Sequence, residues 1–225
     1  MNVLGDALAL AVAGLRIELR TRAALAGAAT LGGVALFLMA LAIGPDPARL
    51  AALAPSVVWV ALAFAAIAIS DRLDGVDRVD DAFAGLWLAA QDRRALYVGK
   101  LLALGTVLVG IEGVLWTLAV VLFEVPLGPA LAALVPLALA VALAVAAVCV
   151  LAQALVGTTT HRALLLPVVV LPLLLPTLLT ASGAAGAVLA GSSTDALAPL
   201  GLLAIQAALY LGLGLLVYEA AAAPE

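Results

Sequence analysis

Long apolar runs separated by short polar segments dominate the chain. Six runs are long enough, at roughly 20 residues each, to cross a bilayer as a helix. No segment between them is long enough to form a soluble domain, so residues 1–225 are predicted to be a single transmembrane domain. The pattern therefore predicts an all-α integral membrane protein with six transmembrane helices. The spans lie at about Ala23–Ile43, Leu50–Ser70, Leu96–Phe123, Ala130–Val156, from Ala163 onward, and Leu197–Tyr218.

The fifth run is irregular in two ways. Its three prolines remove backbone donors and crowd the preceding turns, so we expect helix kinks at Pro167, Pro172 and Pro176. The small-residue stretch that follows, residues 181–193, either continues the helix or folds back as a re-entrant segment.

The first 22 residues have a different pattern. Leu8, Val12 and Leu15 fall near one face of a helix, while Asp6 and Arg16 lie away from that face. A helix of this kind lies in the membrane interface. We expect residues 1–22 to form a cytoplasmic amphipathic helix that leads into the first span.

Composition and charge support a membrane protein and predict its orientation. The chain is 67% hydrophobic and only 11% charged, which leaves too few polar residues to cover a soluble domain. If the N-terminus is cytoplasmic, nine of the ten Lys and Arg residues fall in cytoplasmic segments and only Arg49 lies outside. Because cytoplasmic loops carry such an excess, we expect a multi-pass protein of the cell membrane with both termini cytoplasmic.

The stretch from Ser70 to Lys100 holds eleven of the 24 charged residues. We expect residues 71–95 to form a cytoplasmic loop that contains a short coupling helix. In residues 80–90, apolar side chains share one helical side and charges border it, a pattern that suits insertion into a cleft of a soluble partner. The candidate docking residues are Asp80, Asp81, Phe83, Leu86, Trp87, Arg93 and Arg94.

A metal-dependent membrane phosphotransferase is a competing interpretation of this loop. Asp71, Asp74 and Gly75 match the start of the D-x2-D-G motif whose aspartates hold divalent metals through oxygen. The match then fails, because Arg78 and Val79 stand where the motif requires Ala and Arg, and no G-x3-D-x3-D follows. We therefore predict no metal site and no catalytic residue. The chain also lacks a Walker A sequence, so it does not hydrolyse ATP by that route.

Three polar residues interrupt the apolar runs. Glu112 lies deep in the third run, where an ionisable group costs on the order of 3 kcal/mol. It either lines a substrate path or forms an interhelical hydrogen bond as a protonated carboxyl. Gln153 and Gln206 are the partners that we consider for such a bond.

Four segments share the pattern of a known family: Ala54–Leu73, the E-L-R-x-R pattern at Glu18–Arg22, the loop that ends at Lys100, and Leu164–Leu179. Together they resemble the CcmB family, the permease subunit of the haem exporter type ABC system for cytochrome c maturation. The length and the six-span layout agree with that family as well. In the charged loop, Asp80 and Asp81 stand for the family's acidic pair, but the following Gly and the later Glu are missing.

The resemblance implies a permease without its own ATPase site. It implies docking by a CcmA-like ATPase, CcmC-like and CcmD-like membrane subunits, a CcmE-like haem chaperone, and a second permease copy. ATP would act through the partner subunit, and haem is the transported or handled ligand that the family suggests. The alternative within the same architecture is an ABC-2-type permease that exports a drug, a lipid or a polysaccharide.

Overall fold

Six long helices make up most of the computed structural model, which describes residues 7–12, 15, 23–79, 93–128, 130–156 and 162–221. Each helix is long and apolar enough to cross a membrane. The prediction of an all-α, six-span protein is thereby confirmed. The helices are α2 (Ala23–Ile43), α3 (Pro47–Val79), α5 (Arg93–Phe123), α6 (Leu131–Val156), α7 (Arg162–Leu189) and α8 (Ser193–Ala221).

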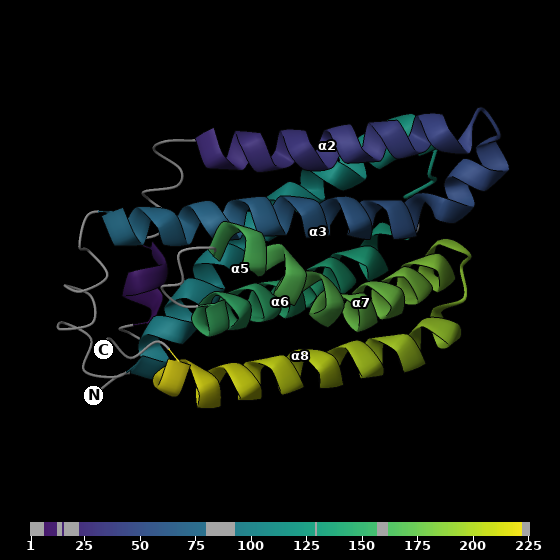
Figure 1. The fold of residues 1–225 in the computed structure, drawn as a ribbon. Coiled ribbons are helices and arrows are strands. Elements are labelled where there is room, and N and C mark those ends of the chain that lie inside the picture. The colour runs from purple at the N-terminus through teal and green to yellow at the C-terminus, as the bar shows by residue number, and fades with distance from the viewer. Residues whose placement is uncertain are drawn as a thin grey trace.

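The helices run alternately in opposite directions through one bundle (Figure 1). The α2–α3, α5–α6 and α7–α8 connections lie at one end, which we call the turn end. The first residues of α2, α5 and α7 and the last residues of α3, α6 and α8 lie at the other, which we call the loop end. Arg94, Lys100 and Arg162 belong to the loop end and Arg49 to the turn end. The charge asymmetry of the sequence therefore separates the two ends of the bundle.

α6 is the central helix. It packs against α3, α5, α7 and α8, whereas α2 packs mainly against α3 and α5. Between Val141 and Val156, every residue of α6 except Leu143 and Leu155 is buried. Many of these residues are alanines, which allow neighbouring helix backbones to approach closely.

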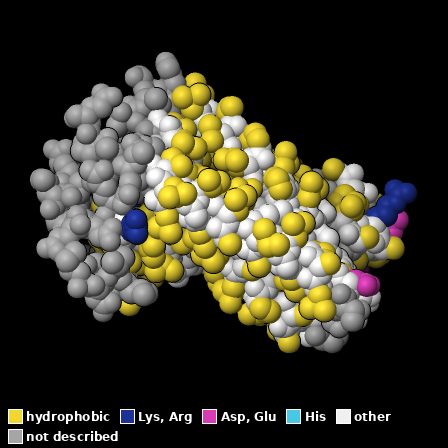
Figure 2. All heavy atoms as spheres, turned by 90° about the horizontal axis from the view of Figure 1, so that it is seen from below, with side chains coloured by type: hydrophobic (Ala, Val, Ile, Leu, Met, Phe, Trp, Pro, Cys, Tyr) yellow, Lys and Arg dark blue, Asp and Glu magenta, His cyan; other side chains and the backbone are white. Residues whose placement is uncertain are grey.

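Exposed leucines and valines cover the middle of the bundle. Figure 2 shows hydrophobic side chains across the middle of one face, while the charged side chains that are coloured lie near its two ends. Leu164, Leu179 and Leu216 are among the most exposed of the large apolar residues. A water-soluble monomer does not expose apolar surface over such an area, so this surface faces lipid.

Asp46 forms the start of α3 in the short turn after α2. Its Oδ1 atom accepts hydrogen bonds from the backbone N–H groups of Ala48, at 3.0 Å, and Arg49, at 3.3 Å. Pro47 occupies the first helical position, where a missing N–H costs nothing. The helix therefore begins three residues before the predicted span at Leu50.

Helices extend into the predicted cytoplasmic loop at 71–95 from both sides. Residues 71–79 continue α3, and residues 93–95 are the first residues of α5. No proline follows Pro55 in α3, and the arginines near its end are good helix formers, so the helix runs past the apolar span. Residues 80–92 lie outside the described residues, and the coupling helix stays a prediction.

The alternative of a re-entrant segment after the fifth span is wrong. α7 continues to Leu189, and Gly191 then adopts a φ of 77°. The Ser192 N–H donates to the Ala187 carbonyl at 3.0 Å, and the Gly191 N–H donates to the Val188 carbonyl at 3.1 Å. These two bonds form a Schellman motif, which ends the helix and turns the chain into α8.

All three prolines of the fifth run lie inside the continuous helix α7. The kinks that we expect at Pro167, Pro172 and Pro176 stay a prediction.

Residues 7–12 are helical, and they belong to the predicted amphipathic segment. Leu8 is exposed and Ala7 is buried, so this short helix has one outer and one inner side. A Cβ atom on Gly99 would stand 2.9 Å from the Leu10 Cβ atom. The short helix therefore lies directly against the first turns of α5, where only a glycine leaves enough room.

Replacing Gly191 tests the turn between α7 and α8. Gly191→Ala should lower the unfolding free energy by about 1–2 kcal/mol, because an L-residue at this positive φ is strained. The measurement is thermal unfolding of the purified chain in detergent. Gly183→Ala is the matched control, since Gly183 lies inside α7 with no atom within 4 Å of an added Cβ. A Gly191→Ala protein as stable as the Gly183→Ala protein would contradict the assigned turn.

Candidate functional site

Apart from Gln206, the polar residues that the sequence singles out fall in three places in the bundle. The first is the loop end, where α3 ends and α5 begins. The second is a buried polar cluster around Ser70. The third is the carboxyl of Glu112, which faces a groove between α5 and α6.

The loop end includes the attachment points of the predicted docking residues. Arg94 is exposed in the first turn of α5. Arg93 is the first residue of that helix, and its side chain is not among those that the structure describes. The other five candidates lie outside the described residues, so the docking role of the whole set stays a prediction. These five are Asp80, Asp81, Phe83, Leu86 and Trp87.

The polar cluster joins α3 to α6 just before α3 becomes charged. The Gln153 Nε2 atom donates to the Ser70 carbonyl at 2.8 Å, and both residues are buried. The Ser70 hydroxyl donates to the Ile67 carbonyl at 3.1 Å. Ser70 was not among the predicted site residues, because its partner Gln153 lies 83 positions away on another helix.

A second set of hydrogen bonds joins α5, α8 and α7. Gln206 Nε2 donates to Thr180 Oγ1 at 3.3 Å, which links α8 to α7. The Tyr97 hydroxyl donates to the Tyr210 carbonyl at 3.4 Å, and the Tyr210 hydroxyl donates to the Leu173 carbonyl at 2.7 Å. Both predicted glutamines therefore form interhelical hydrogen bonds.

The predicted pairing of Glu112 with either glutamine is wrong. Gln153 bonds to α3 and Gln206 bonds to α7, and neither reaches α5 through a described bond. Glu112 is only 1% exposed, and neither carboxyl oxygen has a hydrogen-bond partner among the described residues. A buried carboxyl without a partner destabilises the chain in either protonation state.

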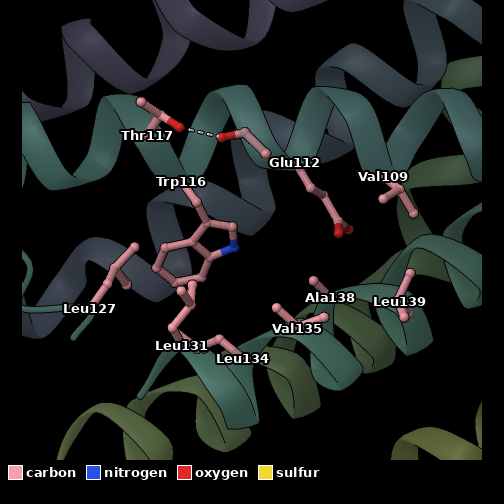
Figure 3. Close-up of a pocket in the computed structure, with 11 residues that line it drawn as sticks. Val109, Glu112, Trp116, Thr117, Leu127, Leu131, Leu134, Val135, Ala138 and Leu139 are labelled. Atoms are coloured by element: carbon pink, nitrogen blue, oxygen red, sulfur yellow. Dashed lines mark hydrogen bonds between the residues drawn. The ribbon is translucent and has the colours of Figure 1, made fainter. Parts of the chain in front are cut away.

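The Glu112 carboxyl points into a groove of about 250 Å³ between α5 and α6 (Figure 3). α6 supplies the opposite wall from Leu131 to Leu139, and all five of its lining residues are aliphatic. Leu131, Val135 and Leu139 are also exposed, so the groove opens on the lipid-facing surface. The groove is thus an apolar site that contains one acidic group.

Trp116 lines this groove and packs against a second tryptophan, Trp59. The rings of Trp59 and Trp116 meet edge to face, with centroids 5.6 Å apart and planes at 79°. The two tryptophans therefore pack against each other inside the bundle. The Trp116 indole nitrogen faces the groove in Figure 3 and has no hydrogen-bond partner among the described residues.

Glu112 lies midway along the apolar part of α5. It is twelve residues from Lys100 and twelve from Glu124, which correspond to about 18 Å along the helix axis in each direction. Because the hydrocarbon core is about 30 Å thick, the carboxyl lies near its midplane. Substrate and ion sites of transporters are common at this depth.

Comparisons with known proteins agree with the six-span architecture. A family model described as "CcmB protein" matches residues 6–224, which is nearly the whole chain. No curated protein and no solved structure matches the chain. The matched range includes the loop end, the Ser70 cluster and the Glu112 groove.

Replacing Gln153 tests the bond between α3 and α6. Gln153→Leu keeps a similar volume but removes the donor to Ser70, so it should lower the unfolding free energy by about 0.5–1.5 kcal/mol. The effect is measured by thermal unfolding in detergent micelles. Gln206→Leu is the comparison, and its effect should be smaller because its bond is longer and only partly buried. A Gln153→Leu protein of unchanged or raised stability would contradict the stabilising role.

Proposed function

Because the chain belongs to the CcmB family, membrane subunits of an ABC transporter for cytochrome c maturation, we propose that it couples ATP hydrolysis by a partner subunit to conformational change in the membrane. The observation that carries this proposal is the continuity of α3. This helix runs through the membrane span, passes the Ser70 cluster and continues nine residues further to Val79. A force applied at the loop end thus reaches the bundle through one unbroken helix.

The ATPase docks at the loop end in this proposal. Residues 80–92 connect the last residue of α3 to the first residue of α5, so a partner that moves this segment pulls on both helices. Phe83, Leu86 and Trp87 would form the apolar contact with the ATPase. Arg94 is exposed beside that contact, where its side chain can pair with acidic groups or lipid headgroups.

The Ser70 cluster passes movement from α3 to the rest of the bundle. Gln153 ties α3 to α6, and α6 in turn packs against α5, α7 and α8. Buried hydrogen bonds of this kind resist separation of the helices, because a broken bond leaves polar groups unpaired. A displacement of α3 is therefore carried to α6.

We propose that the loop end and both termini face the cytoplasm of a cell whose plasma or inner membrane holds the chain. The described basic residues support this orientation, because Arg94 and Lys100 are at the loop end and Arg49 is at the turn end. The partners in the assembled complex are a CcmA-like ATPase, CcmC-like and CcmD-like membrane subunits, a CcmE-like haem chaperone and a second copy of the permease. Haem is the cargo that this complex handles.

Charge placed on the docking segment tests the coupling proposal. Phe83→Asp and Trp87→Asp should each reduce co-purification of the ATPase at least about tenfold, because apolar aromatic anchors supply most of the binding energy in such contacts. Binding is measured by pulling down the full chain co-expressed with the ATPase. Gly128→Asp is the matched control, because it adds the same charge in the α5–α6 turn at the other end. Unchanged ATPase binding in both loop variants would rule out docking at this segment.

Single cysteines test the orientation. In a Cys149→Ser background, Arg49→Cys should react with a membrane-impermeant maleimide added to intact cells. Arg94→Cys should react only after the cells are permeabilised. Labelling of Arg94→Cys in intact cells would reverse the assigned orientation.

A further inference from the structure

Four small residues lie on the outward face of α5, which also carries the exposed valines Val114, Val120 and Val121. Thr106, Gly110, Gly113 and Thr117 are all exposed, and their spacing places them on one side of the helix. An added Cβ on either glycine would meet no atom within 4 Å. The threonine hydroxyls donate back to the Leu102 and Gly113 carbonyls of the same helix, each at 2.7 Å. This face is therefore open and shallow, and its hydroxyl protons are already used within α5.

Such a face suits close contact with another transmembrane helix. Helices in lipid gain no hydrophobic driving force from association, so their interfaces use small residues that let two backbones approach, together with interhelical hydrogen bonds. The α5 face provides the small residues. The Glu112 carboxyl, buried and without a partner among the described residues, provides an acceptor in the adjoining groove.

A lipid headgroup does not fit the position of this acceptor. Glu112 lies about 18 Å from either polar end of α5, while headgroups stay at the membrane surface. The groove, at about 250 Å³, is also smaller than the 300–1,000 Å³ typical of sites for drug-sized ligands. It has room for a few side chains of a packed helix.

A second copy of the chain complements the groove poorly. Two copies inserted with the same orientation are related by an axis along the membrane normal. A residue of one copy therefore contacts residues of the other copy that lie at the same depth in the membrane. At the depth of Glu112, the described residues of this surface offer Gly113 and the aliphatic wall of α6 around Ala138. Besides its own Glu112, a second copy brings the Trp116 N–H to this groove, but that donor lies four residues, about 6 Å along the helix axis, from the depth of Glu112. A donor at the depth of Glu112 itself is therefore supplied by a different chain.

We propose that the α5–α6 groove and the small-residue face of α5 are the docking site for a transmembrane helix of a different membrane subunit. That helix carries a hydrogen-bond donor side chain opposite Glu112. The contact would satisfy the Glu112 carboxyl and cover the open glycines. The site is separate from the ATPase contact at the loop end, so it does not depend on the coupling proposal.

Photo-crosslinking in the native membrane tests this interface. The full chain is expressed in the membranes of its own host with p-benzoylphenylalanine at Val114, which is 46% exposed beside Gly113. The control position is Val168 on α7, which is 66% exposed. We expect an adduct with another membrane protein from Val114 and not from Val168. Mass spectrometry should place the link in a transmembrane segment, within one helical turn of a donor side chain.

Variants of the acid and of the small face show whether this adduct depends on the proposed contacts. Glu112→Leu should reduce the adduct yield about three- to twentyfold, the range expected for one interhelical hydrogen bond. Glu112→Gln should retain most of the yield, because its amide oxygen still accepts a hydrogen bond. Gly113→Leu should also reduce the yield by filling the shallow face. Gly201→Leu is the matched control, because Gly201 is an equally open glycine on α8.

ATPase co-purification measured in the same samples separates this proposal from the coupling proposal, since these variants should leave that binding unchanged. If Glu112→Leu does not fold, Gly113→Leu and Glu112→Gln still decide the question. An adduct with a second copy of this chain, an adduct with lipid alone, or a yield that is insensitive to both Glu112 and Gly113 would overturn the proposed interface.

Discussion

The absence of a hydrophobic driving force between helices in lipid is the constraint on which this bundle depends. Apolar side chains gain nothing by leaving a hydrocarbon solvent, so the helices associate through close packing and through bonds between polar groups. α6 meets the first requirement, because its buried half from Val141 to Val156 is rich in alanine and touches four neighbouring helices. The positions of α5, α7 and α8 are set largely by contact with α6, whereas α3 packs more extensively against α2, α5 and α7.

Polar side chains meet the second requirement, and most of them are paired. Gln153 joins α6 to α3, Gln206 joins α8 to α7, and Tyr97 and Tyr210 join α5, α8 and α7. Four other buried polar atoms among the described residues also lack a partner, but Glu112 is the one carboxyl among them, and both of its oxygens are unpaired. An acid that the described residues leave unpaired near the midplane is best explained by a contact from outside the chain. This contrast, rather than the acidity of Glu112 alone, makes the groove a candidate contact site.

The helices could be predicted from the sequence because their length and apolarity are local properties. The first span matches α2 from Ala23 to Ile43, and the other boundaries that the sequence predicted lie within about four residues, except at the end of α3. The end of α3 was not predicted, because charged residues show where a helix leaves the lipid but do not show where the helix itself ends. The Schellman turn at Gly191 was likewise not predicted, since a glycine within a small-residue stretch has no distinctive local signal.

The polar pairs were less predictable, because a hydrogen bond between helices depends on how each helix is rotated in the bundle. The positions of Glu112, Gln153 and Gln206 within apolar runs showed that each was unusual. The sequence did not show that Gln153 faces Ser70 while Glu112 faces the groove between α5 and α6. The docking residues at 80–92 remain a prediction for a different reason, because their contacts belong to a segment outside the described residues.

The Ser70 cluster divides α3 into two parts of unequal length, and this difference has a mechanical consequence. The Ser70 cluster holds the helix nine residues from Val79 and 23 residues from Pro47, which are about 14 Å and 35 Å along the axis. A rigid rod that pivots at Ser70 moves its far end about two and a half times as far as its near end. In the proposed coupling, a small tilt imposed at Val79 would therefore be amplified at the turn end, on the opposite side of the membrane. α3 would in this sense act as a lever whose fulcrum is the Ser70 cluster.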